Sequence, residues 1–422
     1  MEKEMIKLAD KVQQCGSTIV TKTDAELRAM VKSFKARLNK GETLDSLLPE
    51  AFAVAKEAIK RVFKYEIKQE QIIAGIGLHT GRIVEVTDSK DKQAPRLMAA
   101  YLNSLTGKGV HILATNNSEV VDANGRKEVI TNDDGCKKLM EQDQPFYAFL
   151  GTTIGLCKTN APKKEKQKAY NSDITYTTAN EVGFDLIRDG IAIKSEDRVV
   201  RELSYAISND AISTIIDNAR TPLILNMKTK DGQEKIVGRL TMAMVFFLYA
   251  KKSGLITTGQ NHKSAIKKLY AIDSMSVIQK ANNKTEDEEK SDALAFAVQY
   301  DSILNLKQVA IFEERASILD EGTAYERVLA ALSANNKKAY LEKRDRLTKE
   351  GFNFAQLETD LYLSIIDEEW VNFITDMTKK STEAKMAQEF YELVETQYKS
   401  MCEGIKRRAA DFLLKIQIEK KK

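Results

Sequence analysis

The chain has 422 residues, enough for two or three domains, and its 65 basic and 61 acidic residues leave a net charge of only +4. This balance argues against a nucleic-acid partner. The four cysteines form no CxxC pair and there are only three histidines, which argues against a zinc site or a disulfide framework and indicates a reducing compartment. The amino terminus is charged rather than apolar, so we expect no signal peptide and a cytoplasmic protein.

Two helices are predicted in the first sixty residues. Thr23 and Glu26 have the spacing of a capping box, which opens a helix through Leu38. Pro49 suits the first turn of a second helix. The apolar residues of that helix repeat at helical spacing: Phe52, Ala55, Ile59, Val62 and Phe63.

From about Gly75 to Asn226, short apolar strands alternate with amphipathic helices, which is typical of a parallel αβ domain. The predicted strands are residues 110–115, 154–158, 173–177, 205–208 and 223–226. His111 lies within the first of them, and we expect a hydrogen-bonded core histidine there rather than a catalytic one.

The rest of the chain contains a short mixed region and then helices. Its most apolar run, residues 240–250, is too short to cross a bilayer and predicts a buried helix. This part of the chain either covers a protein face or forms a subunit interface. The highly charged residues 281–291 predict an exposed connection. Helices are predicted over residues 293–322, 324–348, 354–378 and 385–417.

Several runs resemble SecA, the motor ATPase of bacterial protein export. In the first half they are residues 27–63, "AAYLNSLTGKGVH" (99–111), "DITYTTANEVGFDLIRD" (173–189) and "IIDNARTPLI" (215–224). In the second half, residues 299–319, 366–377 and 405–418 resemble parts of the SecA helical scaffold. The segments follow one another in the order of the family.

The resemblance implies a RecA-like, P-loop-type parallel αβα domain followed by a helical scaffold domain. We therefore expect a first nucleotide-binding domain at residues 1–228, a replacement segment and linker at 229–290, and a scaffold domain at 291–422. Full SecA proteins carry a preprotein-crosslinking domain and a second RecA-like domain between these parts. The roughly seventy residues available here are too few for either one.

The loop "DSKDKQ" lies where the family has its phosphate loop, Gly-Glu-Gly-Lys-Thr. The matching residues are Ser89, Lys90, Asp91, Lys92 and Gln93, so only the lysine is retained. A phosphate loop needs glycines to aim backbone N–H groups at phosphate, and a hydroxyl to hold Mg²⁺. Asp91 instead brings negative charge to the phosphate position, and Gln93 lacks the hydroxyl.

The acidic motif of the family, Asp-Glu-x-Asp, matches Asn209 to Ile212, which places Asp210 at the position of the catalytic glutamate. Gln71 matches the glutamine that reads adenine, and Arg220 matches the "ARTP" segment. Gln71, Lys92, Asp210 and Arg220 are thus the candidate nucleotide-binding residues. Lys92 could equally be a surface lysine, and Gln71 a polar residue at a helix start. We predict no catalytic residue and no metal ligand.

The missing domain and two features of the scaffold region bear on function. Without a second RecA-like domain there is no arginine finger to stabilise phosphoryl transfer. Residues 379–385 replace the fingertip loop of the family, and we interpret them as a solvated turn. Trp370, the only tryptophan, is predicted to pack against a neighbouring helix, with an interface anchor as the alternative.

Three functional hypotheses follow. The first is a non-catalytic SecA relative that binds a protein partner, such as an export component or a preprotein segment, and contacts the inner membrane only through a channel partner. The second is a residual ATP-binding protein or ATPase, with ATP and Mg²⁺ as cofactors. The third is a repurposed interaction module or effector. Under the first hypothesis we expect no cofactor and no nucleic acid.

Overall fold

The computed structural model describes residues 2–114, 118–121, 127–130, 132–228, 232–258, 266–267, 272–276, 288–381 and 387–418. The chain divides into two compact units. The first comprises Met1–Asp185, Val199–Thr221 and Met242–Ala295, and the second comprises Leu186–Arg198, Pro222–Thr241 and Phe296–Lys422.

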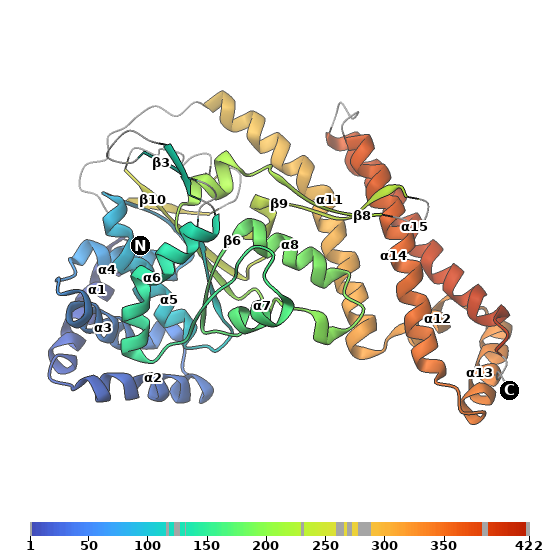
Figure 1. Cartoon of the computed structure of the whole chain (residues 1–422), viewed down its shortest axis with the longest axis horizontal. Coiled ribbons are helices and arrows are strands. Elements are labelled where there is room, and N and C mark those ends of the chain that lie inside the picture. Colours follow the sequence, from blue (N-terminus) through green and yellow to red (C-terminus); the bar gives the residue numbers. More distant parts are fainter. Residues whose placement is uncertain are drawn as a thin grey trace. The chain divides into compact units, whose positions relative to one another are not determined.

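A seven-stranded parallel sheet lies at the centre of the first unit (Figure 1), in the order β11-β1-β10-β7-β2-β6-β5. Every residue of β1, β2, β6 and β7 is buried, as expected for parallel strands covered on both faces. The strands are β1 (Ile83–Val86), β2 (Val110–Ala114), β5 (Ile154–Leu156), β6 (Ile174–Thr178), β7 (Tyr205–Ser208), β10 (Lys251–Thr257) and β11 (Ser274–Ser276). A separate hairpin pairs β3 (Ser118–Val121) with β4 (Lys127–Ile130).

Helices cover this sheet, and together they confirm the predicted RecA-like αβ fold class. They are α1 (Glu2–Ile19), α2 (Asp24–Asn39), α3 (Leu44–Phe63), α4 (Gln69–His79), α5 (Gln93–Ser104), α6 (Asn132–Leu150), α7 (Lys163–Tyr170) and α8 (Ala179–Gly190, which ends in the second unit). The capping box of α2 is present, with both Thr23 and Glu26 taking part. Because parallel strands end at one edge, the loop after β1 meets the residues after β7 although they are far apart in sequence.

Helix α3 begins earlier than predicted. Thr43 is its N-cap, and the Thr43 hydroxyl accepts a hydrogen bond from the backbone N–H of Ser46 at 3.2 Å. Pro49 therefore lies inside the helix rather than in its first turn. Since proline has no N–H, the helix forgoes the bond from residue 49 to the carbonyl of Asp45.

The predicted strand at 205–208 coincides with β7, and those at 110–115, 154–158 and 173–177 correspond to β2, β5 and β6 with shifted ends. Thr115 lies outside the described residues. The strand predicted at 223–226 does exist, but its place in the parallel sheet is wrong. It is β8 (Pro222–Lys228), which pairs antiparallel with β9 (Glu234–Thr241) in the second unit.

The region after β9 completes the sheet of the first unit, a role that the sequence did not predict. Strand β10 pairs with β1 on one side and β7 on the other, and β11 adds to the edge at β1. Within the apolar run at 240–250, α9 (Met242–Phe247) buries four side chains, which confirms the predicted buried helix there: Met242, Ala243, Val245 and Phe246. The exposed connection predicted at 281–291 lies largely outside the described residues.

The second unit is formed by helices and the β8–β9 hairpin. Its helices are α11 (Glu288–Glu321, which begins in the first unit), α12 (Ala324–Ala331), α13 (Ala334–Lys349), α14 (Phe354–Ser381) and α15 (Ala387–Lys415). The single helix predicted at 324–348 is two helices, because Ser333 caps the start of α13. The solvated turn predicted at 379–385 falls mostly outside the described residues, since α14 continues to Ser381.

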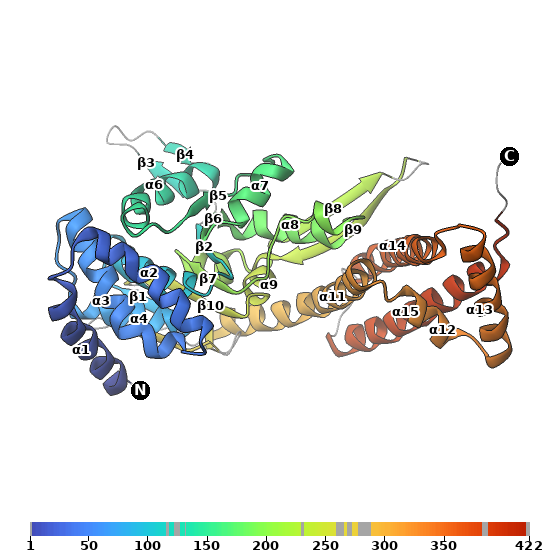
Figure 2. The same ribbon diagram turned by 90° about the horizontal axis from the view of Figure 1, so that it is seen from below.

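Strand β9 packs against α14 (Figure 2). Trp370 of α14 is 2% exposed, and its indole Nε1 donates to the backbone carbonyl of Val237 at 3.0 Å. Its ring also lies 6.2 Å from that of Phe312 on α11. These contacts confirm that Trp370 packs against a neighbouring helix.

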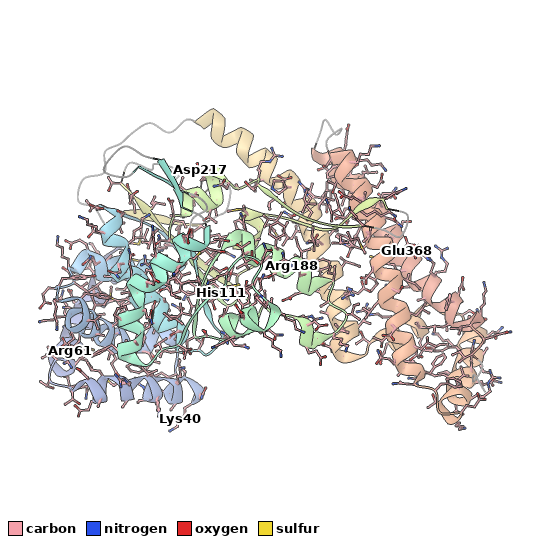
Figure 3. All side chains as sticks on the ribbon, in the orientation of Figure 1. Lys40, Arg61, His111, Arg188, Asp217 and Glu368 are labelled. Carbon is pink, nitrogen blue, oxygen red and sulfur yellow. The ribbon has the colours of Figure 1, made fainter. Side chains whose placement is uncertain are left out.

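His111 lies in the interior of the first unit (Figure 3) and is 3% exposed. Its Nδ1 lies 2.6 Å from the hydroxyl of Tyr249. Burial lowers the pKa of His111 to about 3, and the charge of Arg201 acts in the same direction. The prediction of a hydrogen-bonded core histidine is therefore confirmed.

Candidate functional site

A cavity of about 640 Å³ lies at the edge of the sheet where β1 and β7 end. The loop after β1, the first turn of α5, helix α6 and the residue after β7 all contribute to its wall. The lining residues are Phe63, Ser89, Lys90, Lys92, Gln93, Arg96, Leu139, Gln142 and Asn209. The structure thus brings together the loop and the strand end that the sequence identified as motor motifs.

The loop after β1 forms a short 3₁₀ helix, η1 (Ser89–Lys92), and two of its backbone N–H groups donate to Asp88, its N-cap. The Asp88 carboxylate accepts from the backbone N–H of Lys90 at 3.1 Å, and the Asp88 carbonyl accepts from the N–H of Asp91 at 3.0 Å. In a phosphate loop such N–H groups point at the ligand. Here two of them bond instead to the side chain and the backbone of Asp88.

Lys92 is buried, at 7% exposure, so the alternative of a surface lysine is wrong. Its Nζ donates to the backbone carbonyl of Asn209 at 3.0 Å. Burial lowers the pKa of Lys92, the charge of Asp210 opposes this effect, and the charge of Arg96 adds to it. The ammonium group is thus bonded to the end of β7.

Arg96, which the sequence did not identify, lies at the centre of the site at 2% exposure. Its Nε and one terminal nitrogen donate to the fully buried carboxylate of Asp143 at 2.9–3.0 Å. Its other terminal nitrogen donates to the side-chain oxygen of Asn209 at 2.7 Å. Burial is the largest single influence and by itself would lower the pKa of Arg96, but the charge and hydrogen bonds of Asp143, together with Tyr176 and Tyr147, raise the pKa overall.

Asp143 has further donors. It accepts from the amide of Gln93 at 3.2 Å and from the hydroxyl of Tyr176 at 2.7 Å. Gln93 is the residue that matches the Mg²⁺-holding hydroxyl position, and it donates here to a carboxylate. Arg96 is the only charged residue of α5, which was a signal in the sequence, but nothing local indicates a partner 47 residues away.

The three other candidate residues have different surroundings. The side-chain oxygen of Gln71 accepts from the backbone N–H of Lys68 at 3.1 Å, and its amide lies 3.4 Å from the carboxylate of Asp91. Gln71 thus lies at the start of α4, and its role in reading adenine stays a prediction. Asp210 accepts weakly from the N–H of Ser213, at 3.4 Å. Arg220 is exposed, and neither it nor Asp210 lines the cavity.

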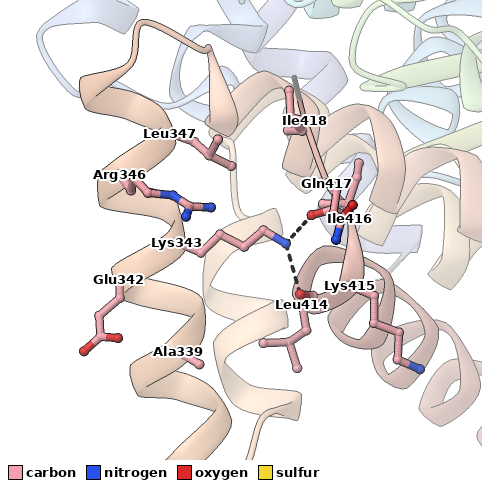
Figure 4. A pocket seen from close by; sticks show the side chains of 10 residues that line it. All are labelled: Ala339, Glu342, Lys343, Arg346, Leu347, Leu414, Lys415, Ile416, Gln417 and Ile418. Carbon is pink, nitrogen blue, oxygen red and sulfur yellow. Dashed lines mark hydrogen bonds between the residues drawn. The ribbon is translucent and has the colours of Figure 1, made fainter. Parts of the chain in front are cut away.

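A second cavity of about 820 Å³ lies in the second unit, between α13 and the end of α15 (Figure 4). Lys343 donates to the backbone carbonyls of Leu413 and Leu414 at 3.0 Å each, and also to that of Ile416. Its three N–H groups therefore have three acceptors at the end of α15. Lys343 therefore caps the end of α15, and its donors are already used within the protein.

Within the described part of the chain, no group of three His, Cys, Asp or Glu side chains is placed to hold a metal ion. Among the helices that are described, none combines the length and apolar character needed to span a membrane.

The parallel sheet and the site at its edge, formed by the loop after β1 and the end of β7, define a RecA-like domain of the P-loop type. A family model described as the SecA DEAD-like domain matches residues 1–358. The chain therefore belongs to the SecA family.

Three relatives illustrate the similarity, each a "Protein translocase subunit SecA". The protein of Pseudomonas savastanoi pv. phaseolicola is 41% identical over 232 residues, 55% of this chain and 24% of the relative. That of Clostridium botulinum strain Eklund 17B is 42% identical over 232 residues, which is 55% of this chain and 26% of the relative. That of Caldicellulosiruptor saccharolyticus is 43% identical over 224 residues, which is 53% of this chain and 24% of the relative. The matched part of the chain thus spans about a quarter of these relatives.

Proposed function

We propose that this SecA-family chain takes part in protein translocation as a binding protein that does not turn over ATP. The observation that carries the proposal is the bonding at Asn209, which accepts from Lys92 through its backbone and from Arg96 through its side chain. The lysine of the loop and the residue at the metal-binding position are bonded within the protein.

Phosphoryl transfer requires Mg²⁺, a lysine on the terminal phosphates and usually an arginine finger. To place Lys92 on a nucleotide, the protein would have to break its bond to Asn209. A hydrogen bond to a charged group is worth about 1.5–3 kcal/mol, and nucleotide binding would first have to offset that loss. The carboxylate of Asp91 in the same loop would add repulsion.

The spacing of elements also supports the proposal. Only residues 229–233 separate β8 from β9, and only residues 277–287 separate β11 from α11. Neither connection can hold the second RecA-like domain that would supply an arginine finger in the same chain.

The relatives are translocase subunits, and we propose that this chain also binds a protein of the export process, either an export component or a preprotein segment. Binding would take place in the cytoplasm, or at the inner membrane through a channel partner. No cofactor is needed for this role. Residual binding of ATP and Mg²⁺ is the second candidate, and the cavity beside Lys92 is the observation that favours it.

Isothermal titration with ATP and ADP in the presence of Mg²⁺ tests the proposal. We expect no binding tighter than about 100 μM, which corresponds to roughly −5.5 kcal/mol. Tighter binding that is lost in Lys92→Ala but kept in Lys90→Ala would establish the second candidate instead. Lys90 is the matched control because it lines the same cavity but is exposed.

Affinity purification from the native cytosol and membrane fraction tests the connection with export. We expect a translocase component or a preprotein among the bound proteins, at a level that does not change with added ATP. Recovery of no such protein would favour the repurposed interaction module.

A further inference from the structure

A buried ion pair lies beside the cavity, which Arg96 lines, and it matches no part of the phosphate-loop or acidic motif. It joins Arg96 of α5 to Asp143 of α6, with exposures of 2% and 0%. Charges are seldom buried without a function or a compensating set of bonds. This pair has such a set, and each bond ends on a residue of the former motor motifs or of the neighbouring sheet.

The contacts of Arg96 and Asp143 can be compared with those of the metal ion and the phosphate in a P-loop site. In a working P-loop site, a metal ion connects the hydroxyl after the loop lysine to the acidic residue at the strand end, and the phosphate accepts the donors around it. Here the guanidinium of Arg96 contacts Asn209, the residue at the acidic position. The carboxylate of Asp143 contacts Gln93, the residue at the hydroxyl position.

We infer that the Arg96–Asp143 pair is a built-in substitute for a metal ion and a phosphate group. Arg96 supplies the cation and Asp143 the anion, and together they fasten α5 to the end of β7 and to α6. The loop and the strand end are held in an ordered arrangement that needs no nucleotide. This inference rests on the proposed function and deepens it, since it explains how a domain of this kind stays ordered without its ligand.

The bonds of Asp143 resemble those of a bound anion. Its carboxylate accepts three hydrogen bonds from the Nε–NH2 side of Arg96, one from Gln93 and one from Tyr176. A cationic fork with neutral donors around it is how proteins hold phosphate and carboxylate ligands. Arg96 and Gln93 also line the cavity, so a small anion can reach both.

Removing the internal anion should therefore create an anion site. In Asp143→Asn, Arg96 keeps its charge but loses its counter-ion. We expect the apparent melting temperature to fall by roughly 10 °C, from the usual loss on breaking a buried pair and the sensitivity of a domain of this size. Inorganic phosphate, at constant ionic strength against chloride, should restore at least half of that fall.

Four matched proteins make the test specific. The unaltered chain should show only the general stabilisation that phosphate gives to folded proteins, and a response here means a gain beyond that, because Asp143 already occupies the site. Arg96→Met should be destabilised and should not respond, because the cation is gone. The double variant Arg96→Met/Asp143→Leu should regain stability without responding. Asp185→Asn removes another buried carboxylate of the first unit, one that pairs with Lys166, and it should not respond to phosphate.

The inference is overturned if Asp143→Asn shows no phosphate-specific gain, or if the unaltered chain gains as much. If Asp143→Asn does not fold in chloride, its refolding yield in phosphate is measured, and equal yields in both salts overturn the inference as well. This outcome is separate from the titration with ATP. Nucleotide binding by the unaltered chain would contradict the proposed function, whereas the phosphate response concerns only the ion pair.

Discussion

Replacing His111 by glutamine should flatten the dependence of stability on pH. His111 is buried in β2, within hydrogen-bond distance of Tyr249, and the pKa of its ring is lowered to about 3 in the folded chain. In the unfolded chain a histidine has a pKa of about 6.5. The folded state therefore holds a neutral ring under conditions in which the unfolded state binds a proton.

The difference between the two pKa values sets the direction and the size of the change in unfolding free energy with pH. Between pH 6.5 and the folded pKa the unfolded state carries more protons, so stability is full above about pH 6.5 and falls as the pH is lowered. From pH 7 to pH 5, a histidine with these two pKa values loses about 2 kcal/mol of unfolding free energy. His111→Gln should lack that component of the decline, although it will be less stable than the unaltered chain at pH 7.

Urea unfolding at pH 7 and pH 5 measures the effect, and the quantity of interest is the difference between the two free energies. Trp370 lies in the second unit, so its fluorescence does not report on His111. Near-ultraviolet circular dichroism of the buried tyrosines, most of which lie in the first unit, is the better probe. Tyr249→Phe is the control, because it removes the hydrogen bond but leaves the buried ring and its pH dependence. Equal declines in the unaltered chain and His111→Gln would refute the reasoning.

Two further predictions concern the second unit. A Cβ added at Gly190 would lie 2.0 Å from the ring of Phe312, so Gly190→Ala should lower the unfolding free energy by about 1–3 kcal/mol in a Trp370 fluorescence titration. Gly404→Ala, a helical position with nothing within 4 Å, should be neutral or stabilise by up to about 1 kcal/mol; similar losses at both sites would contradict this. Lys343→Met should remove the cap of α15 and cost about 1–2 kcal/mol, with faster hydrogen exchange in its last turn. The exposed Lys349→Met should change stability by less than about 0.5 kcal/mol, and an equal loss there would argue against the cap.

Elements whose signals are local were predicted well. The capping box of α2 and the strand β7 needed only their own residues, since caps and short apolar runs act within a few positions. Strand β8 was recognised as a strand but assigned to the wrong sheet, because the periodicity of a strand does not name its partner. Pro49 misplaced the start of α3, because Thr43 offers a better N-cap one turn earlier.

In the candidate site, too, the residues with a sequence motif were predicted and those without one were missed. Matching to the family assigned Lys92 to the phosphate-loop position and Asn209 to the acidic motif, and in the structure the Nζ of Lys92 lies 3.0 Å from the backbone carbonyl of Asn209. Arg96 and Asp143 carried no motif and were missed. Their ion pair depends on the packing of α5 against α6, and no spacing rule within one helix predicts it.

From the sequence by itself, the fold class could be predicted, because periodicity and caps are properties of neighbouring positions. The sequence also shows that the loop matching the family's phosphate loop contains no glycine. The tertiary structure alone decided which residues the buried charges at this loop contact. Parallel strands bring the loop after β1 and the end of β7 to one edge, and there the buried charges of Lys92, Arg96 and Asp143 had to find partners within the protein. Which partners they found depends on contacts between distant segments, and those exist only in the folded chain.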